Sequence, residues 1–247
     1  MINVKELKPS EWSKRGEEKR KIILEWLCLF HYSNQSVLMQ LLGLNHRNNS
    51  AYFKKLINQQ LIVSVDLPTL KKPAYLLHRN SLALLGYFPH VAGYSFEPRR
   101  ISASLSRHHI AVQRTVLNRI HNYDSVTPER LMRERGKKIP DALLIKREVI
   151  TALEVELSYK SKSKIFLAFT DHARAFRDKK YQFIEYVFVD TTMRDYYLSI
   201  FNEERWPVFR LNSAKNKYVE DKEMFSPASL PGFKESMKFV VEDVLHD

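Results

Sequence analysis

One segment of the chain, residues 149–157, restricts the fold more than any other. It reads Val-Ile-Thr-Ala-Leu-Glu-Val-Glu-Leu and follows a second apolar run, residues 139–145, after a short polar turn. Two such runs separated by a turn are typical of a β-hairpin. Side chains alternate along a strand, so Glu154 and Glu156 share one face while the apolar residues beside them share the other. We therefore expect a sheet that carries two neighbouring acids on a strand of otherwise buried composition.

Acidic side chains in such a position predict a particular chemistry. Two adjacent carboxylates repel each other and lose hydration on burial, so they need cations or a metal ion nearby. Asp141 lies near the start of the partner strand, where it can face Glu154 or Glu156 across the hairpin. Three carboxylates at a sheet edge form an all-oxygen site suited to Mg²⁺ or Mn²⁺. The alternative is a solvated strand face on which these acids form ordinary surface salt bridges.

A divalent ion at this position would suit the cleavage of a phosphodiester. Such an ion lowers the pKa of a bound water and stabilises charge on the scissile phosphate. Basic residues follow the second strand directly and can neutralise developing charge: Lys160, Lys162 and Lys164. The three acids and the lysine cluster together favour a metal site over the solvated face.

The charge balance independently favours a polyanionic partner. The 247 residues include 40 Lys+Arg and 28 Asp+Glu, a formal net charge of +12. A basic chain of this kind points to nucleic acid before acidic lipid. A single cysteine, Cys28, excludes an intramolecular disulfide and a Cys-rich zinc site. No apolar stretch approaches the ~20 residues that span a bilayer, so we expect no membrane insertion and a cytoplasmic location.

The first part of the chain, residues 18–87, has the outline of a winged helix-turn-helix domain. Three short helical patterns precede two strand-like runs and a last helix, at residues 22–30, 35–42, 52–57, 61–65, 74–77 and 82–85. Ser33 or Asn34 can cap the second helix and Asn45 the third. Residues 88–100 carry two prolines and a glycine without clear periodicity, which predicts a linker.

The third helix and the hairpin tip of this domain are the predicted DNA contacts. A short helix with polar residues at its start can enter the major groove. The candidate base-contacting residues are His46, Arg47, Asn48, Asn49 and Ser50. Lys54 and Lys55 can reach phosphates from the helix, and Lys71 and Lys72 can do so from the hairpin tip. The alternative is a winged helix with a solvated helix face that serves protein contacts.

The second part, residues 101–247, alternates helices and strands, which predicts an α+β or α/β domain with a mixed sheet. A helix over residues 104–121 is expected before the sheet, and Thr127-Pro128-Glu129 reads as a further helix start. After the hairpin we expect, in order, a crossover helix over 165–176, a strand over 183–189, a helix over 193–201, a strand over 208–211 and a closing helix over 237–245.

Two segments of this part resemble a known family. Ile139-Pro140-Asp141-Ala142-Leu143-Leu144 and Ala152-Leu153-Glu154-Val155-Glu156-Leu157-Ser158-Tyr159-Lys160-Ser161 resemble the replication-relaxation family, and within it the MobC-type plasmid relaxases. The resemblance implies a winged helix followed by a nuclease domain similar to the PD-(D/E)xK restriction-endonuclease fold. It also implies that Asp141 and Glu154 are metal ligands. The third motif position, usually lysine, is Glu156 here, and Lys160 at the Lys-Ser step is our choice for the role of that lysine.

These observations predict a metal-dependent DNA endonuclease with Asp141, Glu154, Glu156 and Lys160 as its catalytic residues. The resemblance implies strand-specific nicking of supercoiled plasmid DNA at a transfer origin, with accessory mobilisation proteins as partners. The main alternative is a non-catalytic winged-helix replication initiator or repressor. A third interpretation is a restriction-type enzyme that cuts both strands.

Overall fold

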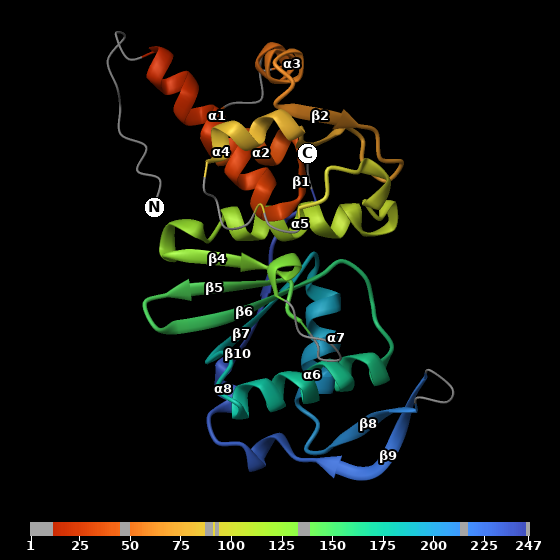
Figure 1. The fold of residues 1–247 in the computed structure, drawn as a ribbon. Coiled ribbons are helices and arrows are strands. Elements are labelled where there is room, and N and C mark those ends of the chain that lie inside the picture. Colours follow the sequence, from red (N-terminus) through yellow and green to blue (C-terminus); the bar gives the residue numbers. More distant parts are fainter. Residues whose placement is uncertain are drawn as a thin grey trace. The chain divides into compact units, whose positions relative to one another are not determined.

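The computed structural model describes residues 12–44, 50–86, 91, 94–132, 139–212 and 217–245. The chain forms two compact units, Met1–Arg119 together with Asp247, and Ile120–His246 (Figure 1). Both contain helices and strands, so the predicted mixed α+β composition is confirmed.

The first unit combines five α-helices with a small antiparallel sheet in its described part. The helices are α1 (Trp12–Phe30), α2 (Gln35–Leu41), α3 (Ser50–Asn58), α4 (Leu82–Leu85) and α5 (Ser106–Leu117), with 3-10 turns at Arg79–Ser81, Pro98–Arg100 and Ala103–Leu105. The sheet has the order β1-β3-β2, formed by β1 (Tyr32–Asn34), β2 (Ile62–Val65) and β3 (Ala74–Leu77).

Local chemistry fixes the beginning of α2. The Asn34 side chain accepts a hydrogen bond of 3.0 Å from the Val37 amide, which satisfies one of the free donors at the helix start. This confirms one of the two predicted caps. Gly43 follows the helix with a φ of 62°, a left-handed conformation that glycine adopts without strain. The predicted cap Asn45 lies outside the described residues.

Helix α5 belongs to the first unit rather than to the second domain for which it was predicted. The indole of Trp26 on α1 donates to the Gln113 side chain at 2.8 Å, and Gln113 donates to the Tyr32 carbonyl at 2.8 Å. Gln113 is fully buried, so these hydrogen bonds replace its lost hydration. The division between the units therefore falls after Arg119, and not within the linker expected at residues 88–100. In that linker the Tyr94 hydroxyl donates to the His31 carbonyl at 2.6 Å, which ties this segment to the first unit.

The second unit is built on a five-stranded mixed sheet of order β10-β7-β6-β5-β4. Its elements are β4 (Ser125–Pro128), β5 (Ala142–Lys146), β6 (Val149–Glu156), α6 (Lys162–Arg177), β7 (Phe183–Phe188), α7 (Thr191–Phe201), β8 (Trp206–Asn212), β9 (Lys217–Phe225), α8 (Phe233–Ser236) and β10 (Met237–Val241), with 3-10 turns at Ile120–Asn122, Glu129–Leu131 and Pro227–Ser229. Strands β4, β5 and β6 are antiparallel neighbours, whereas β6, β7 and β10 run parallel. The predicted hairpin and crossover helix are confirmed as β5–β6 and α6.

Two predictions for this unit were wrong, and a third element joins a different sheet. Residues 125–128 form the edge strand β4 instead of a helix start, and Pro128 is tolerated because it ends a strand at the sheet edge. The strand predicted at 208–211 is confirmed within β8, which pairs with β9 in a separate two-stranded sheet. Residues 237–241 form β10 rather than a closing helix, because their apolar and β-branched side chains complete the sheet beside β7.

An aromatic core lies on one face of the five-stranded sheet. Phe169 of α6 is fully buried, and its ring centroid lies 5.3 Å from that of Trp206 and 5.7 Å from that of Tyr186. Helices α6 and α7 and strand β7 all contribute to this cluster. Ala152 of β6 is a member too, so the strand face that carries Glu154 and Glu156 points into the same core.

Candidate functional site

The register of the hairpin brings the three predicted acids together. Ala142 of β5 pairs with Leu153 of β6, so Asp141, one residue earlier, lies level with Glu154. The Asp141 amide donates to the Leu153 carbonyl at 3.0 Å, and its side chain accepts from the Val155 amide at 2.7 Å. Asp141 is therefore fixed against the carboxyl end of β6, as the hairpin pattern predicted.

Both glutamates of β6 are buried and each contacts a basic side chain. Glu154 is 4% exposed and Glu156 is 3% exposed, so the solvated face considered from the sequence is wrong. The Glu156 carboxylate accepts a charge-assisted hydrogen bond of 2.7 Å from the Lys160 amine. The Glu154 carboxylate lies 3.1 Å from Nε2 of His172, a residue of α6 that is 1% exposed.

All three acids affect the pKa of the Lys160 amine. Partial burial alone would lower the pKa of its amine, because the charged form loses hydration. The carboxylates of Glu156, Glu154 and Asp141 outweigh this effect, so the pKa of Lys160 is raised. The amine consequently stays charged. The Lys160 side chain is 41% exposed, so this positive charge lies at the surface of the cluster.

Tyrosine side chains surround the acids on their buried side. Burial, followed by the negative charge of Glu154, raises the pKa of Tyr181 and that of Tyr186. Burial and the neighbouring carboxylate of Glu156 raise the pKa of Tyr197 in the same way. All three phenols therefore stay neutral at physiological pH, and none is a nucleophile activated by a lowered pKa.

His172 is the component of this cluster that the sequence interpretation missed. Its Nδ1 lies 2.6 Å from the Tyr181 hydroxyl, while its Nε2 faces Glu154. One proton placement agrees with both distances: Nδ1 accepts from the phenol, and Nε2 carries the ring proton on the side of the Glu154 carboxylate. The sequence did contain a signal for His172. This residue lies three positions after Phe169, on the buried stripe of the helix that directly follows the acidic strand.

The donor set was tested against the predicted divalent ion. In the part of the chain that the structure describes, no group of three or more His, Cys, Asp or Glu side chains is arranged to hold a metal ion. Asp141, Glu154 and Glu156 therefore do not form a ready three-carboxylate site, and Glu156 is engaged by Lys160. Asp141 and Glu154, at level positions, fit the simpler requirement of Mg²⁺, which usually takes one or two carboxylates together with waters and substrate phosphates.

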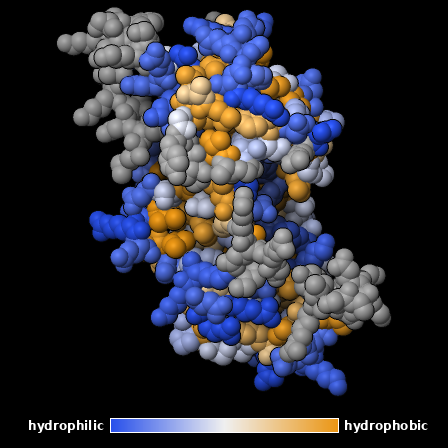
Figure 2. Space-filling model, viewed as in Figure 1, coloured by the Kyte–Doolittle hydropathy of each residue, from blue (hydrophilic) through white to orange (hydrophobic). Residues whose placement is uncertain are grey.

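The predicted DNA contacts divide into described and undescribed residues. Ser50, Lys54 and Lys55 are exposed on α3, whereas Phe53 and Leu56 of the same helix are buried. Figure 2 shows a mostly hydrophilic surface where Figure 1 draws α3. The four remaining helix candidates lie outside the described residues: His46, Arg47, Asn48 and Asn49.

The loop between β2 and β3 carries the other two lysines. Lys71 and Lys72 are exposed, and the loop beneath them is anchored on the segment that leads into α5. Leu67 is buried in a cluster with Ile101, and the Thr69 hydroxyl donates to the Ala103 carbonyl at 2.7 Å. The two cations are therefore presented from a fixed loop.

Comparison of the chain with models of protein families, with curated proteins and with solved structures found no match. Within the described residues, no helix is both long and apolar enough to cross a membrane. The function proposed below consequently depends on the side chains themselves.

Proposed function

We propose that this protein is a metal-dependent DNA endonuclease. The observation that carries the proposal is the set of acids at the carboxyl end of β6: Asp141 lies level with Glu154, and the buried Glu156 contacts the Lys160 amine, whose pKa all three acids raise. Burying two acids, Glu154 and Glu156, beside the half-buried Asp141 is costly unless a compensating charge is present, and such clusters are concentrated at functional sites. A divalent cation that binds there would complete the neutralisation and attract a phosphate.

Each side chain has a distinct part in this proposal. Asp141 and Glu154 would hold Mg²⁺ or Mn²⁺, which supplies a water of lowered pKa and charge stabilisation at the scissile phosphate. Lys160 would offset the negative charge that develops on the phosphate oxygens. Glu156 holds the Lys160 amine through their 2.7 Å contact, and His172 orients the Glu154 carboxylate. The last two are positioning residues in this scheme.

The first unit supports DNA as the substrate. Its element order, from α1 through β1, α2 and α3 to the hairpin β2–β3, agrees with the proposed winged helix, and lysines are exposed on both α3 and the hairpin loop. The formal net charge of +12 favours the same partner. We further propose a restriction-endonuclease-like core for the second unit, since its acids lie on an antiparallel hairpin that continues into parallel strands.

The biological act that agrees with the sequence resemblance is strand-specific nicking of supercoiled plasmid DNA at a transfer origin. Accessory mobilisation proteins and a cytoplasmic location belong to the same proposal. One observation favours a second candidate, a non-catalytic DNA-binding protein such as a replication initiator or repressor. Glu154 and Glu156 already contact His172 and Lys160, as expected for acids with a purely structural role.

Conversion of supercoiled plasmid DNA tests the proposal. The full chain with Mg²⁺ or Mn²⁺ is expected to produce open circles, and EDTA is expected to prevent this. Asp141→Asn and Glu154→Gln should each slow nicking at least about a hundredfold, because a bound ion contributes several kcal/mol to transition-state stabilisation. Glu148→Gln, an exposed acid in the turn of the same hairpin, is the matched control and should nick normally.

The other outcomes of this assay identify the alternatives. Specific DNA binding without strand breakage, under any divalent ion, would leave the non-catalytic protein. Rapid linear product would indicate the restriction-type enzyme that cuts both strands. Unchanged nicking by both Asp141→Asn and Glu154→Gln would end the assignment of the active site.

A further inference from the structure

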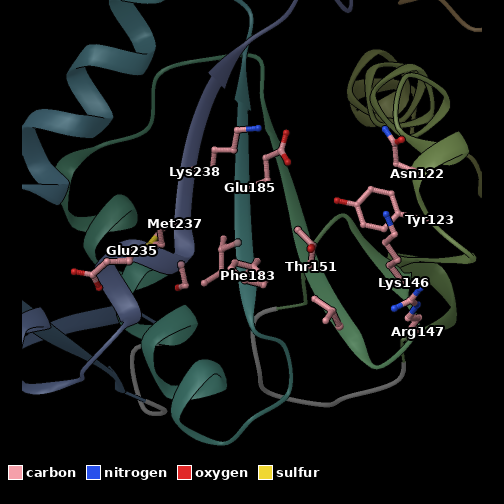
Figure 3. A pocket seen from close by; sticks show the side chains of 13 residues that line it. Asn122, Tyr123, Lys146, Arg147, Thr151, Phe183, Glu185, Glu235, Met237 and Lys238 are labelled. Carbon is pink, nitrogen blue, oxygen red and sulfur yellow. The ribbon is translucent and has the colours of Figure 1, made fainter.

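A second surface feature lies elsewhere in the unit Ile120–His246. A groove of about 810 Å³ opens beside the turn of the β5–β6 hairpin and the first residues of β7 and β10 (Figure 3). Its lining includes Tyr123, Lys146, Arg147, Val149, Phe183 and Lys238. All of the lining residues belong to this one unit.

Strand register separates the groove from the carboxylate cluster. Phe183 pairs with Thr151 of β6, and Glu185 pairs with both Leu153 and Lys238. These residues share one face of the sheet, whereas Glu154 lies on the other face. Phe183 also begins β7, level with the start of β6, while Glu154 and Glu156 end β6. The groove is therefore a different site from the proposed catalytic one.

The groove contains apolar surface that remains in contact with water. Phe183 is 47% exposed and Val149 is 42% exposed, although both are large apolar side chains. Figure 3 shows Tyr123 on the opposite side of the groove from Phe183. Two aromatic side chains on either side of an open hollow provide ring faces against which a flat ligand can stack.

The accessible charge on the Tyr123 side of the groove is positive. Lys146 and Arg147 are exposed in the hairpin turn, beside Tyr123 (Figure 3). The turn is fixed, because the Arg147 amide donates to the Asp124 carboxylate at 2.6 Å and the Asp124 amide donates to the Ile145 carbonyl at 2.8 Å. Of the two acids of the lining, one is buried and the other is exposed on the side of the groove away from this turn (Figure 3).

Glu185 and Glu235 are these two acids. Glu185 is only 8% exposed, and in Figure 3 its carboxylate and the Lys238 amine point toward each other. Glu235 extends away from the Tyr123 side of the groove in the same view. A ligand that enters between Tyr123 and Phe183 therefore meets the cations of Lys146 and Arg147 first.

We propose that this groove binds a single strand of nucleic acid. Exposed bases would stack on Phe183 and Tyr123, while the phosphates would contact Lys146 and Arg147. A duplex cannot use these rings in the same way, since its bases are already stacked on one another. The volume suits a ligand of about nucleotide size. Binding of this kind needs neither strand cleavage nor a metal ion, so it goes beyond the proposed nuclease and is tested separately.

Fluorescence anisotropy with a labelled single-stranded oligothymidine, in EDTA, tests the proposal on the full chain. Phe183→Leu keeps an apolar side chain but removes the ring, and should weaken binding roughly tenfold. Phe183→Trp keeps an aromatic ring and should bind as tightly as the parent. Lys146→Gln should lower the slope of log affinity against log salt by about 0.7, the value for one phosphate contact on a single strand. Lys222→Gln, an exposed lysine of β9 outside the groove, is the control for lost charge and should not change the slope.

Other classes of ligand for this groove would give different results in the same experiment. Unchanged affinity in Phe183→Leu, or an equal effect of Lys222→Gln, would overturn the proposal. Competition by free thymidine monophosphate at an equal nucleotide concentration would assign the groove to a mononucleotide instead. A Phe183→Leu effect of the same size on blunt duplex would overturn the single-strand preference. As a local measurement, photocrosslinking of a 5-iodouracil oligonucleotide should modify Tyr123 or Phe183, and crosslinks confined to the unit Met1–Arg119 would contradict the assignment.

Discussion

His109 of α5 should make the first unit sensitive to acid. Its ring stacks on Tyr32, with 4.2 Å between the ring centroids, and Nε2 lies 3.1 Å from the Tyr32 carbonyl oxygen. Burial lowers the pKa of His109 from 6.5 to about 4, and the hydrogen bond to the carbonyl, which raises the pKa, offsets only part of that effect. The nearby His31 and His108 lower the pKa further.

The direction of the pH effect follows from the lowered pKa. Between pH 6.5 and about 4 the unfolded chain takes up a proton at His109 that the folded chain does not. Stability is therefore present above pH 6.5 and is lost as the pH falls. Each pH unit in this window is equivalent to about 1.4 kcal/mol, so the loss at pH 5 is at most about 2 kcal/mol. Because part of His109 is exposed to solvent, we expect about 1–2 kcal/mol.

Urea denaturation of His109→Gln measures this contribution. The glutamine amide can donate to the Tyr32 carbonyl but does not titrate, so its free energy of unfolding should fall about 1–2 kcal/mol less than that of the parent between pH 7 and pH 5. A Trp206→Phe background leaves Trp12 and Trp26, both in the first unit, as the fluorescent reporters. His121→Gln replaces an exposed histidine and serves as the control. Equal pH dependence in the parent and in His109→Gln would refute the reasoning.

The remaining predictions concern both units. Lys160→Met removes the amine that contacts the buried Glu156 carboxylate and should lower the free energy of unfolding by about 1–3 kcal/mol in urea titrations, while the exposed Lys164→Met should change it by less than about 0.5 kcal/mol. His172→Phe should slow metal-dependent nicking about 10–100-fold, because a positioning contact to Glu154 is lost, and normal nicking by a folded variant, as judged by circular dichroism, would exclude that role. Phe169→Ala should cost about 3–5 kcal/mol in denaturation followed by Trp206 emission, since the ring is fully buried, and a cost below about 1 kcal/mol would contradict the described core. The double variant Lys54→Gln/Lys55→Gln should reduce the salt slope of duplex binding by about 2, and an unchanged slope would remove α3 from the DNA interface.

Local patterns in the sequence were sufficient for much of the second unit. The alternation at residues 149–157 correctly predicted a hairpin with both glutamates on one face, because side-chain period is a local property. The apolar stripe of α6 was equally clear. Strand β10 was missed because residues 237–241 become a strand only through parallel pairing with β7, a contact with no local signature.

The assembly of the site depended on information that the sequence does not display. The level position of Asp141 and Glu154 followed from the hairpin register, so it could be anticipated. The contact between His172 and Glu154 could not be, since it requires α6 to fold back over β6 through a crossover connection. Similarly, α5 was assigned to the wrong side of the division because an apolar helical pattern does not identify the surface it packs against, whereas buried contacts such as those of Gln113 with Trp26 and Tyr32 place it in the first unit.

Iron-mediated cleavage of the polypeptide tests most directly whether the acids hold a divalent ion. Fe²⁺ takes the place of Mg²⁺ or Mn²⁺, and the hydroxyl radicals that it generates with ascorbate and peroxide cut the chain near the ion. The cuts, mapped by mass spectrometry, should fall beside Asp141 and in the last residues of β6, and should disappear in Asp141→Asn and with excess Mg²⁺. Cuts that are scattered along the chain, or that persist unchanged in Asp141→Asn, would contradict a metal site at these carboxylates.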